Sequence, residues 1–300
     1  MELIVVANEI VVGADTAWRR SGAVDWALHE AILRRMPLRA VHVVDERRRH
    51  ADVAPVKIDG EVIIPDPVPA ADQRVLDELS SYVAAADPAL DLGTDVLVGA
   101  PSRRLAELSA EAELTVVGRR GAGGFARLLL GSTSEYIAYH GQGPVVVVPA
   151  GWQGRPGGAP IVVGVDAHEQ NDGALAFAFE MADLHHAPLR MVHAWDVAAR
   201  DTLDLAAIPD LRDHQQRLAG ELLDAVAEPL QHKHPDVHVE RTLIEGHPVE
   251  ALLDTAESPA AQLLVIGGRH HRATTLMLGS VARGVLHHAT VPVAVVHERT

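Results

Sequence analysis

The sequence predicts an α/β protein made of two tandem domains, each built on a doubly wound parallel sheet. Short β-branched runs alternate with longer helix-like segments, as in doubly wound folds. The strand-like runs are apolar at nearly every position, which is typical of a sheet covered by helices on both faces. The whole pattern occurs twice within 300 residues, enough for two domains of ordinary size.

The repeat keeps its order along the chain. Ile10-Val-Val-Gly-Ala-Asp15 returns as Ile161-Val-Val-Gly-Val-Asp166, at an offset of 151 residues. Three later segments also return, with offsets of 151, 149 and 148: 37–45 as 188–196, 114–118 as 263–267, and 144–148 as 292–296. The repeat predicts a first domain at 1–150 and a second at 160–300. The Gly- and Pro-rich residues 151–159 between them suit a linker.

The elements of the first domain follow from these runs in order. Runs rich in Val, Ile and Leu predict strands at 10–14, 38–44, 94–98, 114–117 and 145–148. The longer segments between them predict helices at 21–35, 70–86, 102–112 and after Ser132. The apolar segment 3–7 is either an edge strand or a packed arm, and 47–69, with its four prolines, is expected to form an irregular flap.

Composition excludes several classes of protein. The formal net charge of −15, without a long basic stripe, argues against a general nucleic-acid or membrane-surface binder. With no cysteine, the chain has no disulfide, thiolate nucleophile or cysteine metal site. The apolar runs are too short to span a membrane and no basic segment precedes the first of them, so a cytoplasmic location is expected.

The stretch from Gly118 to Ser132, GRRGAGGFARLLLGS, has the layout of a phosphate-binding loop. It follows an apolar strand and leads into a helix. Glycines let backbone N–H groups approach an anion, and a helix N-terminus adds unpaired N–H groups and the positive end of its dipole. Arg119, Arg120 and Arg127 add positive charge. Parallel sheets bind ligands beyond the carboxyl ends of their strands, where Asp15, Asp45 and this loop are expected.

The spacing Gly118, two residues, Gly121, nine residues, Gly131-Ser132 resembles the G-2x-G-9x-G-[S/T] signature of the ATP-binding universal stress proteins. The resemblance covers nearly the whole chain as a tandem pair, and includes Asp15 and the pattern around His42. It implies an ATP site, with the role of Mg²⁺ left open. In that site Asp15 and the Val43 backbone would hold the adenosine end. Gly118 and Gly121 would let the chain pass close to ribose and phosphates, and phosphate oxygens would be bound by Gly131, Ser132 and Thr133. The alternative is that Ser132 only caps a helix and the glycines only form turns.

The second domain departs from this signature. His270 stands where the second glycine belongs, and eight residues rather than nine precede Gly279-Ser280. Starting from Gly268 instead places His271 at the same point. Corresponding positions do survive as weaker binding candidates: Asp166, Ala194, Gly267, Gly279 and Ser280. We therefore expect weaker, altered or absent nucleotide binding in the second domain.

Fourteen of the eighteen histidines lie in the second half of the chain. No HExxH pattern occurs among them, so we expect dispersed surface histidines rather than a metal site. No catalytic residue is predicted either. The GxxxxGK[ST] loop is absent, which disfavours a P-loop NTPase mechanism, and no general base accompanies the arginines of the loop.

Two functions remain. The favoured one is an ATP-binding stress-response regulator whose occupancy changes its conformation or its partners. The alternative is a slow ATPase or autophosphorylating enzyme that uses the same site, with Ser132 or Thr133 modified. The resemblance also implies pairing through the valine-rich last strands, with the two halves as a pseudo-dimer and further homodimerisation.

Overall fold

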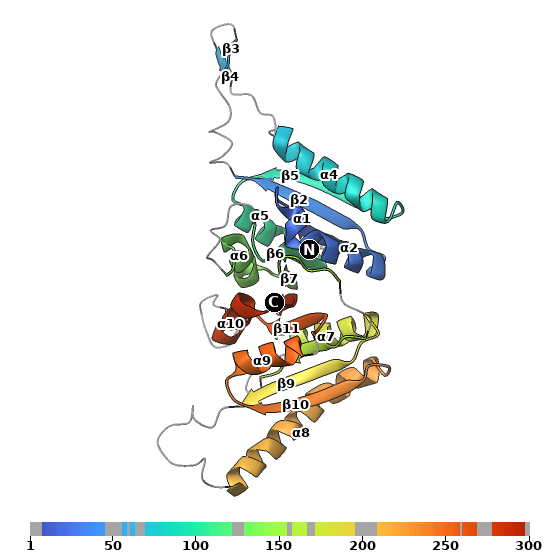
Figure 1. The fold of residues 1–300 in the computed structure, drawn as a ribbon, viewed down its shortest axis with the longest axis vertical. Coiled ribbons are helices and arrows are strands. Elements are labelled where there is room, and N and C mark those ends of the chain that lie inside the picture. The colour runs from blue at the N-terminus through green and yellow to red at the C-terminus, as the bar shows by residue number, and fades with distance from the viewer. Residues whose placement is uncertain are drawn as a thin grey trace, which may run out of the picture. The chain divides into compact units, whose positions relative to one another are not determined.

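The computed structural model describes residues 8–45, 56–58, 61–63, 70–121, 129–154, 158–166, 172–195, 209–258, 260–268 and 278–297. The chain divides into two compact units, residues 1–152 (unit 1) and 153–300 (unit 2). In the described ranges, each unit is a parallel sheet with helices on both faces, which confirms the predicted fold class (Figure 1).

Unit 1 contains the elements β1 (Ile10–Gly13), α1 (Trp18–Ser21), α2 (Ala23–Arg34), β2 (Leu38–Val44), β3 (Val56–Ile58), β4 (Glu61–Ile63), α4 (Ala70–Ala86), β5 (Leu92–Val98), α5 (Pro101–Leu108), β6 (Leu114–Gly118), α6 (Ser132–His140) and β7 (Val145–Val148). Its sheet has the order β7-β6-β1-β2-β5. Helices α2 and α4 lie on one face and α5 and α6 on the other (Figure 1).

Unit 2 contains the elements β8 (Ile161–Gly164), α7 (Asp172–Leu184), β9 (Leu189–Trp195), α8 (Pro209–Lys233), β10 (Val239–Glu245), α9 (Pro248–Glu257), β11 (Leu263–Gly267), α10 (Ser280–His288) and β12 (Val293–Val296). Its order, β12-β11-β8-β9-β10, is that of unit 1. The registers also agree, because Ile10 lies beside Leu38 and Leu114 as Ile161 lies beside Leu189 and Leu263.

The helix predicted at 21–35 is α2, and a one-turn helix that was not predicted, α1, precedes it. Gly22 separates α1 from α2 with a φ of 71°, in the left-handed region that glycine adopts readily. The strand predicted at 94–98 begins at Leu92, and the helix predicted at 102–112 ends at Leu108. Residues 3–7 lie outside the described part of the chain.

The segment 47–69 was predicted to be irregular. Part of it is regular, because β3 and β4 pair as an antiparallel hairpin. The register places Ile58 opposite Glu61, so the residues between them are Asp59 and Gly60. Asp-Gly is a pair that two-residue hairpin loops favour. The prediction of an irregular segment rested on its four prolines and did not use this pair.

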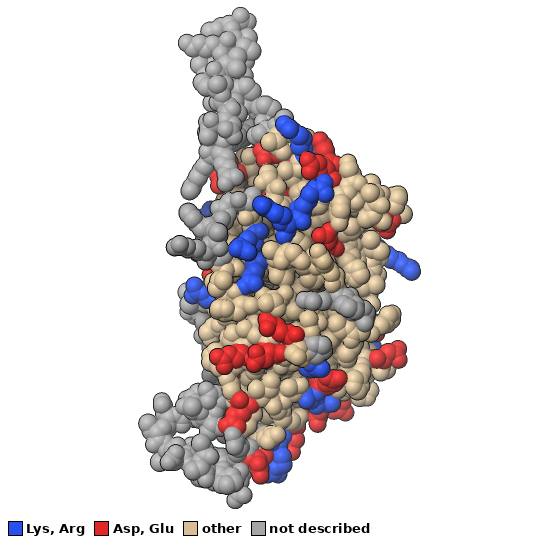
Figure 2. Space-filling model, viewed as in Figure 1, with Lys and Arg blue, Asp and Glu red and all other residues tan. Residues whose placement is uncertain are grey.

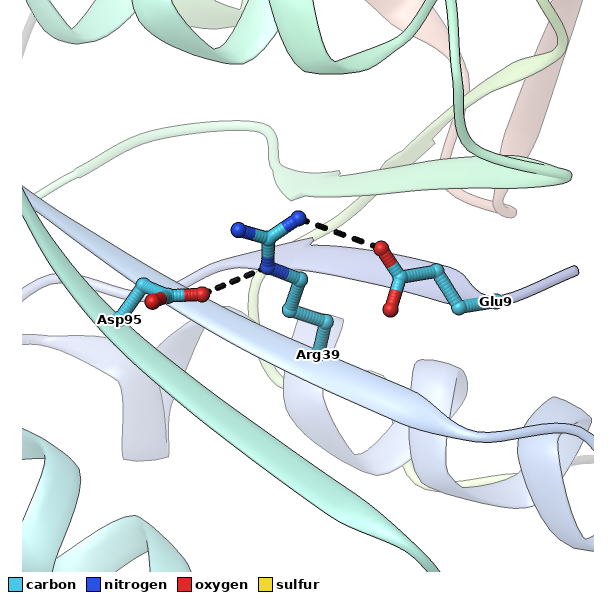
Figure 3. A network of polar contacts seen from close by, with 3 residues as sticks. All are labelled: Glu9, Arg39 and Asp95. Atoms are coloured by element: carbon cyan, nitrogen blue, oxygen red, sulfur yellow. Dashed lines mark hydrogen bonds and ion pairs between the residues drawn. The ribbon is translucent and has the colours of Figure 1, made fainter. Parts of the chain in front are cut away.

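A polar network joins neighbouring strands of unit 1 at the end of the sheet away from the loops that follow β1 and β6 (Figure 3). Arg39 Nε donates to Asp95 Oδ2 at 2.6 Å and Arg39 Nη1 to Glu9 Oε1 at 3.2 Å. The hydrogen bond to Asp95 is the main cause that raises the pKa of Arg39. In unit 2, Arg190 makes a similar pair with Glu240 at 2.9 Å. Within the described ranges, no helix is both long and apolar enough to cross a membrane.

Candidate functional site

Strands β1 and β6 form the centre of the unit 1 sheet, and the chain leaves them toward opposite sides. From β1 it continues to β2, and from β6 to β7, which lies at the other end of the strand order. Such a reversal opens a crevice at the carboxyl ends of the two strands, where doubly wound proteins bind their ligands. Asp15 follows β1 at this point, and Gly118 to Gly121 follow β6.

The carboxylate of Asp15 lies against Gly121. Its Oδ1 accepts the backbone N–H of Ala17 at 2.8 Å, which fixes the side chain over the turn after β1. Its Oδ2 occupies the space that a Cβ on Gly121 would need. Gly118 is constrained similarly, since a Cβ there would lie 2.6 Å from Ser21 Cβ. The absence of a side chain at Gly121 and Gly118 therefore leaves space for the side chains of Asp15 and Ser21 respectively. The spacing of the glycines alone does not indicate this role.

The N-terminus of α6 is tied to the end of β6 by two hydrogen bonds. The Gly131 N–H donates to the Arg119 carbonyl at 2.8 Å, and the Ser134 hydroxyl donates to the Gly118 carbonyl at 2.6 Å. These bonds hold Gly131, at the start of α6, beside Arg119 and Arg120, the two residues that precede Gly121. Sequence reasoning missed Ser134 as a site residue, although it lies only two residues after Ser132.

Gly131, not Ser132, is the N-cap residue of α6, and no side chain caps the helix. This differs from the alternative in which Ser132 serves only as a cap. Ser132 is exposed at the first helical position. The first turn of α6 therefore presents backbone N–H groups without a side-chain acceptor, which suits an anion.

Val43 lies on the other side of β1, near the carboxyl end of β2. The ladder pairs Gly13 with Val41, so Val43 extends two residues beyond the last pair of that ladder. Its backbone is therefore beside the turn that carries Asp15. The described residues predicted to form the unit 1 site thus lie at the carboxyl ends of β1, β2 and β6 and at the start of α6, while Arg127 lies outside the described ranges.

The mouth of this crevice is basic. Burial lowers the pKa of Arg119, and the charge of Arg120 beside it lowers it further. An anion near these guanidinium groups would offset both effects. On the face shown in Figure 2, Lys and Arg side chains form a band across unit 1 from α4 over α1 toward α5 and α6. Exposed arginines on these helices are Arg19, Arg20, Arg74, Arg103 and Arg104.

The corresponding region of unit 2 has different chemistry. Asp166 is exposed, whereas Asp15 is partly buried. With the offset of 148, Thr133 and Ser134 correspond to Val281 and Ala282, so two of three hydroxyls at the helix start are lost. Of the weaker candidates, Gly267 ends β11, Gly279 and Ser280 begin α10, and Ala194 lies in β9. His270 and His271 lie outside the described residues.

The expectation of surface histidines in the second half is wrong for two of the described ones. His193 and His297 are buried, with 7% and 2% of their surface exposed. The ring of His297 occupies the space that a Cβ on Gly268 would need. Gly268 corresponds to Arg119 of unit 1. In unit 2, the His297 ring therefore takes the space that corresponds to the start of the Arg119 side chain in unit 1. The number of histidines in the sequence does not predict this contact between His297 and Gly268, because it depends on the pairing of β11 with β12.

Comparison with known proteins agrees with the fold and the repeat. The universal stress protein family matches residues 8–149 and 159–297. A universal stress protein of Mycobacterium tuberculosis is 32% identical over 311 residues, covering 96% of this chain and 97% of its own length. The crystal structure of one from Archaeoglobus fulgidus DSM 4304 has a TM-score of 0.61 at 19% identity, covering 98% of this chain and 99% of that chain. A second solved protein from Archaeoglobus fulgidus, in complex with dAMP, covers 47% of this chain and 99% of its own at 27% identity, with a TM-score of 0.37.

Proposed function

Because the chain belongs to the universal stress protein family, in its tandem two-domain form, we propose that it is a stress-response regulator that binds ATP in unit 1. Nucleotide occupancy then changes its conformation or its partners. The observation that carries this proposal is the contact between the Asp15 carboxylate and Gly121 at the switch point between β1 and β6.

The residues around that contact fit an adenine nucleotide. Asp15 offers acceptor oxygens for ribose or adenine donors, and the Val43 backbone lies beside it. The first turn of α6, with Gly131, Ser132 and Thr133, offers N–H groups and hydroxyls for phosphate. The basic band of unit 1 favours a polyphosphate over an uncharged nucleoside. ATP, when bound, would supply the anion that these donors need.

The first test is binding to the purified full chain. Denaturing the protein and identifying the released nucleotide gives the ligand and the moles bound, and titration calorimetry with ATP, ADP and AMP gives the affinities. Gly121→Ala should weaken ATP binding at least about tenfold, because the new methyl group must displace the Asp15 carboxylate. Gly220→Ala is the matched control, since its Cβ would lie 3.9 Å from Leu243 Cδ1, an ordinary contact. Equal affinities for the two variants would contradict the proposed site.

Measuring ATP turnover distinguishes the regulatory proposal from the alternative of an ATP-hydrolysing or autophosphorylating enzyme. The regulatory proposal predicts negligible steady-state hydrolysis of ATP with Mg²⁺ and no phosphate on Ser132 or Thr133 by mass spectrometry. Rapid metal-dependent turnover that is lost in Asp15→Asn or Gly121→Ala would overturn it in favour of the enzyme.

Assembly and location are parts of the same proposal. We expect a homodimer, for which light scattering should give twice the chain mass; a monomer at micromolar concentration would contradict this. A cytoplasmic location predicts that fractionation of the source cells recovers the protein in the cytosol.

A further inference from the structure

His42 of β2 lies between two oxygen atoms from different elements. Its Nδ1 is 2.7 Å from the Ala14 carbonyl oxygen, and its Nε2 is 2.9 Å from Asp72 Oδ1 on α4. A carbonyl oxygen only accepts, so Nδ1 carries a proton and donates to Ala14. The ring is buried, with 5% of the residue exposed, and its two contacts fix its orientation.

The Ala14 carbonyl is joined directly to Asp15. The β1 ladder ends at Gly13, and the Ala14 N–H donates to the Val41 carbonyl at 2.9 Å. Because the peptide unit is planar, fixing the Ala14 carbonyl also fixes the amide nitrogen and Cα of Asp15. The hydrogen bond from His42 therefore holds the backbone from which the Asp15 carboxylate extends toward Gly121.

We propose that His42 and Asp72 are positioning residues for the nucleotide site of unit 1. His42 acts through the Ala14 carbonyl, and Asp72 holds the His42 ring. This inference deepens the proposed function, on which it rests. Asp72 suits the task because it lies in the first turn of α4, where the helix dipole favours a carboxylate.

Unit 2 repeats only half of this arrangement. The Nδ1 of His193 donates to the Val165 carbonyl at 2.9 Å, and Val165 precedes Asp166 as Ala14 precedes Asp15. Among the residues that the structure describes, no carboxylate bonds the other ring nitrogen of His193. Unit 2 therefore serves as an internal control for the role of His42. There His193 makes the equivalent bond to the residue before Asp166, in the unit whose loop departs from the signature.

Two amide substitutions separate the two bonds of the ring. The side chains of asparagine and glutamine place their NH₂ groups near the positions of Nδ1 and Nε2 respectively. His42→Asn therefore keeps the donor to Ala14, whereas His42→Gln loses it and places an N–H donor opposite Asp72. Titration of the full chain with ATP should show His42→Asn within about threefold of the wild type and His42→Gln about tenfold weaker. Asp72→Ala should lose about threefold, because the ring keeps one of its two anchors.

A double-mutant cycle tests whether His42 acts through Asp15. Once Asp15→Asn has removed the carboxylate, adding His42→Gln should cost no further affinity; additive losses would overturn the inference. Equal losses for His42→Asn and His42→Gln would also overturn it, because the ring rather than its bond would then matter. His193→Gln should melt earlier in circular dichroism while leaving the first-site affinity unchanged. A wild-type chain that binds no adenine nucleotide refutes the proposed function itself, whereas wild-type binding with full affinity in His42→Gln refutes only the present inference.

Discussion

Tyr82 of α4 is held to α2 by one short hydrogen bond. Its hydroxyl donates to Asp25 Oδ1 at 2.6 Å, and its ring packs edge-on against Trp18 with 5.3 Å between the centroids. The bond to Asp25, followed by burial, raises the pKa of Tyr82. The folded chain therefore holds the phenol proton more tightly than the unfolded chain does. The stability from this bond is full below the ordinary tyrosine pKa of about 10 and is lost as the pH rises through the folded-state value.

Tyr82→Phe should therefore lower the free energy of unfolding by about 1 kcal/mol at neutral pH. It should also lose less stability than the wild type between about pH 9 and pH 11, because the titrating group is gone. Urea unfolding at several pH values measures both effects. Tyr139→Phe is the control, since Tyr139 makes a tilted ring contact with His140 at 6.3 Å between the centroids. An unchanged alkaline slope in Tyr82→Phe would contradict this account.

Ser134 links the start of α6 to the end of β6, and 3% of the residue is exposed. Ser134→Ala removes the hydroxyl that donates to the Gly118 carbonyl, so we expect a loss of about 1 kcal/mol in stability and a several-fold weaker affinity for ATP. Ser81→Ala is matched, because the exposed Ser81 hydroxyl donates to the Asp77 carbonyl at 2.9 Å. If both variants bind and melt like the wild type, the link does not order the loop.

The residues of the site were only partly predictable. The glycine spacing predicted Gly118, Gly121 and Gly131, and the place after the first strand predicted Asp15, because such patterns are local in the sequence. These patterns did not identify Ser134 or the burial of His42, since both depend on contacts between elements that are distant in sequence. The same reason explains the error over His193 and His297, because a count of histidines says nothing about the strands on which they lie.

At the scale of elements, the junction between α1 and α2 depends on Gly22. A Cβ at this position would lie 2.9 Å from Trp152 Cβ, and the φ of 71° is strained for any residue with a side chain. Gly22→Ala should therefore cost about 1–3 kcal/mol of stability, measured by urea unfolding. Gly93→Ala in β5 is the control, because its Cβ would lie 3.8 Å from Arg39 Cγ and the residue has no positive φ. Similar stabilities for the two variants would show that the junction is not strained.

The parallel strands were predictable as elements because β-branched runs covered on both faces leave a strong signal. The helix break at Gly22 was not, since an isolated glycine inside an apolar pattern does not show whether its φ is positive. The pairing of β3 with β4 was not predicted, because the four prolines of 47–69 indicated an irregular segment.

At the scale of the whole molecule, the two units share a strand order, and we predict that only unit 1 binds ATP. Calorimetry should give one ATP per chain. Asp15→Asn should weaken that binding at least about tenfold, and Asp166→Asn should leave it unchanged, because Asp166 follows β8 in the unit whose loop carries His270. Two equivalents per chain with similar affinities would contradict the asymmetry. The repeat predicted the fold of both units. Only the structure shows that the His297 ring of unit 2 takes the space that corresponds to the Arg119 side chain of unit 1.

The tandem arrangement also affects how the protein changes by mutation. In a homodimer of single-unit chains, any substitution occurs in both copies at once, so an altered loop removes both sites together. Here the two loops are separate stretches of one chain, and the second has lost a glycine and a residue while the first has kept its spacing. Duplication within the chain thus lets selection maintain one loop and release the other, and the numbers of substitutions accumulated in each can differ.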